Sequence, residues 1–242
     1  MDRKLYRELG FESFEGYVEE RLDLSPRTAR RLVRLAAARR VMFAEKSVEI
    51  AASIADALDY AHQREVIHRD VKPANVMLDE KGQAILTDFG IAKIVGGTQH
   101  TASGAMLGTA RYVSPEQVQG RAVSGQSDIY SLGATLFEML AGRPPYEGDS
   151  VISVLMAHVN EPLPDLNQIR PGLAPGLAAA IDKAMAKEPS ARFATAGEMA
   201  RALRAAVSGQ RAQARIAWSA AGRPCASNRF SIEEQMYRWL ST

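Results

Sequence analysis

Four polar residues in the first half of the chain have the types and spacing to act together on a phosphate group. Asp70 has a carboxylate that can accept a proton from a hydroxyl group or orient that hydroxyl. Lys72 lies two residues further along, on the same side of an extended loop, where its ammonium can hold an anionic oxygen. Asn75 and Asp88 offer the hard oxygen ligands that Mg²⁺ prefers. Phosphoryl transfer needs mainly such positioning and charge neutralisation.

Short apolar segments flank these residues and predict the elements that would hold them. Residues 66–67 precede the polar loop, and residues 76–78 and 84–86 follow it, with a turn at residues 79–82 between the last two. Pro73 fixes φ inside the loop. Buried strands around a polar loop would hold its carboxylates rigidly. Each polar residue alone would suit an ordinary turn, so the interpretation depends on their combination.

Three motifs in order resemble the eukaryotic-like (Hanks-type) serine/threonine protein kinases of bacteria. Residues 68–75 read His-Arg-Asp-Val-Lys-Pro-Ala-Asn, residues 88–90 read Asp-Phe-Gly, and residues 114–116 read Ser-Pro-Glu where the family usually has Ala-Pro-Glu. The resemblance covers about residues 43–207, the large C-terminal lobe of that fold. It implies a mainly α (α+β) fold, in which helices and short β-hairpins surround the catalytic loop.

The resemblance also implies roles for the four polar side chains. Asp70 looks like the catalytic base, Lys72 like the contact to the γ-phosphate of ATP, and Asn75 and Asp88 like the ligands of Mg²⁺. A lysine at this place in the loop resembles the serine/threonine rather than the tyrosine subclass. Small-molecule phosphotransferases share a similar loop, but Lys-Pro at residues 72–73 and the Ser-Pro-Glu segment favour a protein substrate.

The segment between Asp88 and the Ser-Pro-Glu motif is rich in glycine and hydroxyl residues. Such a segment stays mobile until a contact orders it. By resemblance, Arg69 implies activation by a phosphate in this segment, and its guanidinium could pair with phosphorylated Thr98, Thr101 or Ser103. An unmodified surface loop is the alternative. Thr109 resembles the family threonine whose hydroxyl bridges the catalytic aspartate and lysine.

Three further residues resemble structural positions of the family. Asp128 opens the most hydrophobic helix and would bond the backbone of the catalytic loop, a role compatible with capping that helix. Glu116 would pair with Arg192 in a buried ion pair. Apolar spacing predicts helices at residues 48–62, 128–142, 151–159, 177–186 and 196–207.

Residues 1–42 show none of the small-lobe features of a kinase. A glycine-rich loop, a strand lysine and a partner glutamate are all missing, so we expect the N-terminal lobe to be absent. Apolar spacing predicts a small helical segment instead, with a basic second helix at residues 27–40. This helix could be part of a helix-turn-helix DNA reader, but a solvated basic face on a helix pair suits the weak net charge better.

The composition sets the remaining bounds. The net charge is +2, with 30 basic and 28 acidic residues, which gives no electrostatic case for nucleic acid. A single cysteine, Cys225, excludes an internal disulfide. No apolar run approaches the ~18 residues of a membrane helix, so a cytoplasmic protein is expected. Residues 208–242 have no counterpart in the lobe and predict a loosely ordered tail, with a possible terminal helix.

Two functions remain open from the sequence. The first is a serine/threonine protein kinase that transfers the γ-phosphate of ATP to a protein, although half of the nucleotide site is not visible. The alternative is a non-catalytic, kinase-derived module that binds or regulates other proteins. Another kinase chain could also supply the small lobe or dock on that side of the site.

Overall fold

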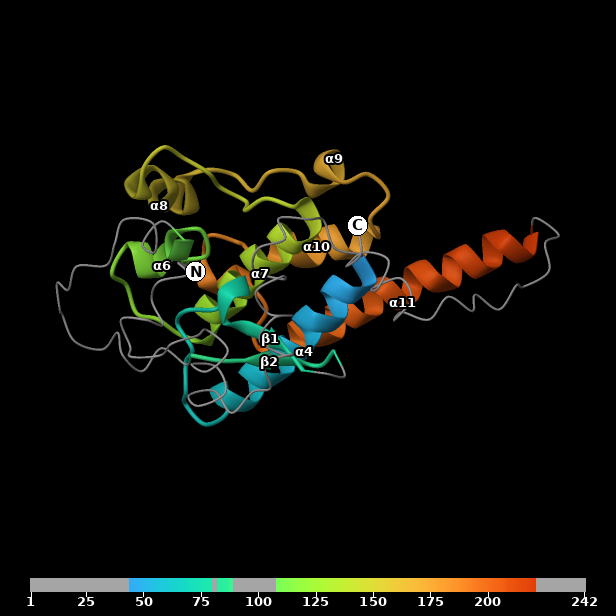
Figure 1. Ribbon diagram of the computed structural model, residues 1–242, viewed down its shortest axis with the longest axis horizontal. Helices are drawn as coiled ribbons and strands as arrows, with labels where there is room; N and C mark the ends of the chain where they lie inside the picture. The colour runs from blue at the N-terminus through green and yellow to red at the C-terminus, as the bar shows by residue number, and fades with distance from the viewer. Residues whose placement is uncertain (1–43, 80–81, 89–107, 221–242) are drawn as a thin grey trace, which may run out of the picture. The chain divides into compact units, whose positions relative to one another are not determined.

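The computed structural model describes residues 44–79, 82–88 and 108–220, and for residues 210–220 it describes the backbone alone. Within these ranges the chain is mainly helical, with one small sheet (Figure 1). The elements in order are α4 (Ala44–His62), η1 (Pro73–Asn75), β1 (Val76–Leu78), β2 (Ala84–Leu86), α6 (Pro115–Val118), α7 (Gly125–Ala141), α8 (Val151–Asn160), α9 (Leu166–Ile169), α10 (Pro175–Ala184), η3 (Pro189–Ala191) and α11 (Ala196–Ala220).

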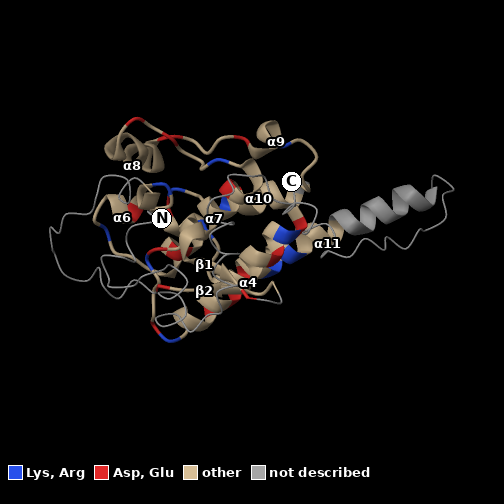
Figure 2. Cartoon of the chain, viewed as in Figure 1, with Lys and Arg blue, Asp and Glu red and all other residues tan. Residues whose placement is uncertain are grey.

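Helix α7 lies at the centre of the core. It packs against α4 on one side and α10 on another. Leu132, Leu136 and Phe137 are at most 1% exposed, and Figure 2 shows few charged residues along this helix. A helix that is apolar nearly all round belongs in the middle of a domain. At Gly133 a Cβ would lie 2.8 Å from Met185 Cγ, so glycine permits the close packing against the end of α10.

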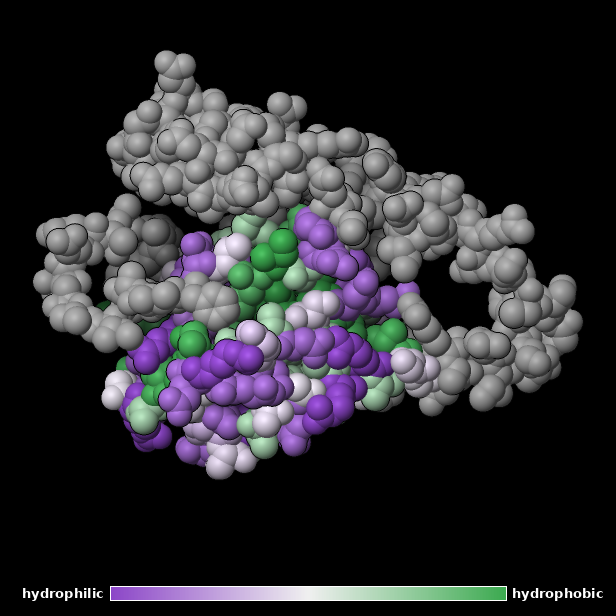
Figure 3. Space-filling view, turned by 90° about the horizontal axis from the view of Figure 1, so that it is seen from below, coloured by the Kyte–Doolittle hydropathy of each residue, from purple (hydrophilic) through white to green (hydrophobic). Residues whose placement is uncertain are grey.

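The two strands form an antiparallel hairpin. Val76 pairs with Leu86, Met77 with Ile85 and Leu78 with Ala84. The hairpin packs against α4 through β2. Seen from below, as in Figure 3, the described residues present hydrophilic side chains around a smaller apolar area. The hairpin brings the residues before β1 and after β2 to the same end of the sheet. The two strands and the turn between them are those predicted from the sequence.

These elements confirm the predicted mainly α fold with a small β component. The expected helical segment before the lobe lies outside the described residues. One helix end differs from the prediction, because α11 continues past residue 207 to Ala220, where a loosely ordered tail was expected. Residues 210–220 are rich in Ala, Arg and Gln, which favour helix even without a strong apolar face.

The chain divides into two compact units, Met1–Val207 and Ser208–Thr242. All the predicted catalytic and structural residues belong to the first unit. Within the residues that the structure describes, no helix is long and apolar enough to cross a membrane.

Candidate active site

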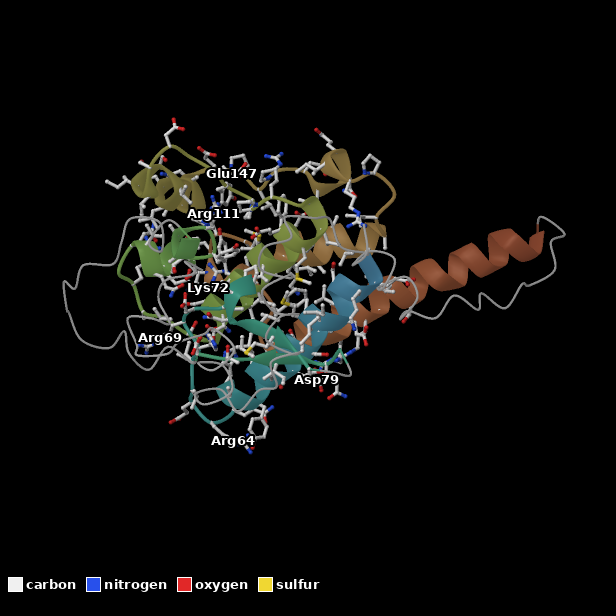
Figure 4. All side chains as sticks on the ribbon, viewed as in Figure 1. Arg64, Arg69, Lys72, Asp79, Arg111 and Glu147 are labelled. Carbon is white, nitrogen blue, oxygen red and sulfur yellow. The ribbon has the colours of Figure 1, made fainter. Side chains whose placement is uncertain are left out.

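Lys72 joins two of the predicted site residues. Its Nζ donates to Asp70 Oδ2 at 2.7 Å and to Thr109 Oγ1 at 3.0 Å. The side chains of Lys72 and Asp70 are 19% and 17% exposed, so the pair is partly sheltered but open to an incoming group. The ammonium holds the carboxylate in one orientation and ties the catalytic loop to residues far along the chain. Figure 4 shows Lys72 on the same side of the molecule as Arg69 and Arg111.

Asn75 is turned toward Asp70. Its Nδ2 donates to the Asp70 carbonyl at 2.8 Å and to Asp70 Oδ2 at 3.3 Å. The short helix η1 begins with Pro73, after Lys72 in an extended conformation, and this turn places Asn75 back over Asp70. Because the amide nitrogen is used by Asp70, the amide oxygen is the atom that remains for a cation.

Asp88 is tied to Asn75 through the backbone of its neighbour. The Thr87 N–H donates to the Asn75 carbonyl at 2.9 Å, and Thr87 Oγ1 donates to the same oxygen at 3.2 Å. Asp88 itself is exposed and has a φ of 59°, in the left-handed region. Aspartate tolerates this conformation better than most residues, and such backbone strain is concentrated at functional sites.

His68 links the base to the hairpin. It is fully buried, and its Nε2 lies 3.0 Å from the Thr87 carbonyl. The Asp70 N–H lies 3.2 Å from His68 Nδ1. These contacts fit one tautomer, in which Nε2–H donates to Thr87 and Nδ1 accepts from Asp70. The imidazole therefore connects the backbone of Asp70 with Thr87, the residue that precedes Asp88.

Asp128 holds the catalytic loop from below. Its Oδ2 accepts from the His68 N–H at 2.8 Å and its Oδ1 from the Arg69 N–H at 2.7 Å. His62 Nε2 donates to Oδ2 at 2.8 Å, and the Asp128 side chain is 1% exposed. A buried carboxylate needs such partners. The contact with the loop backbone is the one that the resemblance implied for Asp128, whereas the contribution of His62 was not foreseen.

Gln117 makes a second contact with the same turn. Its Nε2 donates to the Arg69 carbonyl at 2.9 Å, and its Oε1 accepts from the Ser114 N–H at 3.0 Å and from Ser114 Oγ at 2.9 Å. Arg69 has a φ of 70°, so the turn is strained and is held on both sides. Gln117 was not predicted from the sequence. A glutamine one residue after Ser-Pro-Glu is the only sequence signal for it.

Glu116 and Arg192 form a buried, bidentate ion pair. Arg192 donates to the two carboxylate oxygens of Glu116 at 2.7 and 2.8 Å, and the side chains of Arg192 and Glu116 are 0% and 3% exposed. The guanidinium also donates to the carbonyls of Ala186, Gln126 and Lys187.

The environment of Glu116 favours its charged form. Burial alone would raise the pKa of Glu116, but hydrogen bonds from Arg192 and Ser127 outweigh burial and hold the pKa below its ordinary value. Ser127 Oγ donates to Glu116 at 2.6 Å. The Glu116–Arg192 pair joins α6 to the start of α7 and to η3, underneath the site.

Of the regulatory candidates, some lie inside the described ranges and others lie outside them. Thr98, Thr101 and Ser103 lie outside them, as do Phe89 and Gly90. Arg69 is half-buried, and the hydrogen bonds that the structure shows for it involve its backbone groups. Its guanidinium has no ion pair with any residue of the described ranges.

Comparison with known families agrees with this geometry. The family model of the protein kinase domain matches residues 22–203. The chain belongs to the protein kinase family. The predicted resemblance is confirmed, and the match begins before residue 43, where the sequence analysis began the lobe.

Several bacterial kinases are similar to this chain. The serine/threonine-protein kinase PknB of Mycobacterium leprae is 44% identical over 183 residues, which cover 75% of this chain and 29% of that protein. The probable serine/threonine-protein kinase SCO3848 of Streptomyces coelicolor is 41% identical, covering 71% and 26%. The serine/threonine-protein kinase PknJ of Mycobacterium tuberculosis is 41% identical, covering 69% and 30%. The chain thus spans under a third of the length of these curated relatives.

Proposed function

We propose that this chain is the catalytic lobe of a serine/threonine protein kinase, which transfers the γ-phosphate of ATP to a hydroxyl group of a protein. The observation that carries the proposal is the contact of Lys72 Nζ with both Asp70 and Thr109. An ammonium placed there can hold a transferring phosphate beside a carboxylate that orients the acceptor hydroxyl. The names of the relatives support serine and threonine as acceptors.

Each site residue has one task in this proposal. Asp70 orients the acceptor hydroxyl and takes its proton, while Lys72 stabilises charge on the phosphate. Protein kinases generally use ATP with Mg²⁺, and the amide oxygen of Asn75 and the carboxylate of Asp88 fit Mg²⁺ because both are hard oxygen ligands. The bound metal would neutralise charge on the phosphates. Asp88, a carboxylate that would bind this metal ion, is exposed and therefore accessible to the ion.

The surrounding contacts support and regulate these residues. Asp128 fixes the loop backbone, and the Glu116–Arg192 pair fixes α6, which carries Gln117. We assign Arg69 to bind a phosphate on Thr98, Thr101 or Ser103, which would order the segment that ends at Thr109. We further assign residues 43–207 to the C-terminal lobe and residues 208–242 to an additional segment. Residues 22–42 precede this lobe and are also matched by the family model. The use of ATP favours a cytoplasmic location.

The described residues supply one half of a nucleotide site. In the kinase family a glycine-rich loop and a strand lysine hold the α- and β-phosphates, and the sequence contains no Gly-x-Gly-x-x-Gly motif. We propose that a second kinase chain can supply these groups to the described residues. Without them the lobe acts as a binding module for other kinases or substrates.

Transfer of labelled phosphate from ATP tests both the proposed kinase activity and the proposed completion of the site by a second kinase chain. The wild type, with Mg²⁺-ATP and a generic protein substrate, is compared with Asp70→Asn and with the matched control Asp149→Asn, which changes an exposed aspartate before α8. A relative whose own catalytic aspartate is replaced is then added to provide a small lobe. Label that disappears with Asp70→Asn but persists with Asp149→Asn supports the kinase. Folded protein that never transfers label, alone or in the mixture, rejects it.

A further inference from the structure

His158, in the last turn of α8, is a fully buried imidazole with one nitrogen unpaired. Its Nδ1 lies 2.9 Å from the hydroxyl of Tyr130. Its Nε2 makes no hydrogen bond of normal geometry with the described residues. A buried polar atom without a partner is rare in native proteins and calls for an explanation.

The hydroxyl of Tyr130 decides where the imidazole proton lies. Burial raises the pKa of Tyr130 well above its ordinary value, so this residue is a neutral phenol with a proton to donate. Across the described residues, Nδ1 of His158 is the one acceptor within reach of that hydroxyl. Nδ1 therefore accepts, and in a neutral ring the proton is on Nε2. The unpaired atom is a donor.

Two backbone groups that interact with this imidazole belong to the segment beside the catalytic loop. Burial and the charge of Lys187 lower the pKa of His158 to about 4, while the backbone carbonyls of Arg111 and Ala110 act in the opposite direction. Carbonyl groups do so by accepting from a ring N–H. The ring is thus neutral near pH 7 and faces the backbone of residues 110–111.

That segment is already fixed at both of its ends. Thr109 accepts from Lys72, and the Tyr112 hydroxyl donates to Glu138 Oε2. The Tyr112 N–H donates to the Thr109 carbonyl at 3.2 Å, which closes a turn. Ala110 and Arg111 stand between these anchors, and their backbone groups are the ones that interact with His158. A hydrogen-bond donor to these two carbonyl groups would further stabilise the turn.

The imidazole itself is held in place. Tyr146 packs edge-on against it, with ring centroids 4.9 Å apart. Lys187 Nζ donates to the His158 carbonyl at 2.8 Å and to the Tyr146 hydroxyl at 3.0 Å. A cation at the C-terminal end of a helix also stabilises that end. The ring therefore cannot move to another partner without disturbing α8.

We propose that His158 is a positioning residue, whose Nε2–H donates to the carbonyl groups of Ala110 and Arg111 and so sets the conformation of residues 109–112 beside Asp70. This inference deepens the proposed function, because residues 109–112 would contact the acceptor protein. Arg111 would then be presented to the acceptor at a fixed angle. The loss of this support would weaken acceptor binding more than it would slow the chemical step.

Two measurements test the proposal without requiring phosphate transfer. Long-range ¹H–¹⁵N NMR of the wild type should show His158 as the neutral Nε2–H tautomer at pH 7. Amide hydrogen exchange should then show that His158→Phe loses protection at residues 109–112, while α4 and α7 keep theirs. His158→Gln, which retains an N–H near Nε2, should recover part of this protection. Met156→Ala, on the exposed side of α8, is the matched control and should change nothing there.

Activity adds a third measurement if the kinase is functional. His158→Phe should raise KM for the protein substrate about tenfold, equivalent to one hydrogen bond, with a smaller change in kcat and recovery in His158→Gln. An Nδ1–H tautomer, or equal exchange at residues 109–112 in wild type and His158→Phe, would overturn the proposal. Because tautomer and exchange do not depend on turnover, an inactive protein would reject the proposed function without deciding this inference.

Discussion

The two ends of the catalytic site are held in different ways. The base end is fixed by buried groups: Asp128 accepts from two backbone N–H groups of the loop, and Gln117 donates to the Arg69 carbonyl. At the other end, Thr87 bonds the Asn75 carbonyl and His68, while the neighbouring Asp88 is exposed. The lobe thus holds the Asp70 turn with its own interior, whereas the side chain of Asp88 is left exposed.

The largest effect on the free energy of unfolding should come from the buried Glu116–Arg192 ion pair, which supports the Asp70 end of the site. Arg192→Met leaves Glu116 buried without its cation, and the free energy of unfolding should fall by about 3–5 kcal/mol. Urea denaturation at pH 7 measures this change.

A matched arginine on α11 gives the control. Arg204 pairs with Asp56, but these side chains are 50% and 52% exposed, so Arg204→Met should cost less than about 1 kcal/mol. Equal losses for the two variants would show that burial does not determine the strength of these pairs.

A pair of aspartate variants compares the two ends directly. Asp128→Asn weakens hydrogen bonds to a buried charged group, and should lower the free energy of unfolding by about 1.5–3 kcal/mol. Asp88→Asn changes an exposed side chain and should stay within about 0.5 kcal/mol. Thermal or urea unfolding of both proteins, without Mg²⁺, measures the difference. A destabilisation by Asp88→Asn as large as that by Asp128→Asn would remove the contrast between the two ends.

A smaller effect should appear in the pH dependence of stability. The pKa of Glu116 in the folded protein lies below its ordinary value of 4.5, so the folded state binds fewer protons there than the unfolded state. The contribution of Glu116 is therefore complete above about pH 4.5 and is lost as the pH falls through the lowered folded pKa.

Arg192→Met should reverse this sign. Burial alone raises the pKa of Glu116, so the variant should lose less stability than the wild type between about pH 5 and pH 3. Urea midpoints across this range measure both proteins. Parallel curves for the two proteins would show that Glu116 is not responsible for the pH dependence of stability in this range.

The sequence was sufficient for the residues that act within a short motif. Asp70, Lys72 and Asn75 stand within six residues of each other, and the sequence placed Asp70 and Lys72 on the same side of one loop, where the structure joins them. The hydrogen bonds from Asn75 to Asp70 were not predicted. Asp88 could be placed because two short apolar segments predicted the hairpin that returns it to Asn75. Such local patterns can be interpreted from the sequence without knowledge of the rest of the fold.

Contacts between distant residues had weaker signals. Gln117 reaches Arg69 across the fold and His158 contacts Tyr130, yet an isolated glutamine or an isolated histidine in a helix has no distinctive spacing. The extension of α11 was not predicted, because an Ala-, Arg-, Ser- and Gly-rich composition indicated a loosely ordered tail, whereas its Ala and Arg residues favour helix by their own propensity. The helix propensity of the same residues would have predicted it.

Hydrogen exchange at the catalytic loop tests the central claim most directly. In the wild type, the amides of His68 and Arg69 should be protected, because both donate to the buried carboxylate of Asp128. In Asp128→Asn this protection should fall at residues 68–69, while the strand amides at residues 76–78 and 84–86 keep theirs. Protection at His68 and Arg69 that survives in Asp128→Asn would contradict the conclusion that the interior of the lobe fixes the base.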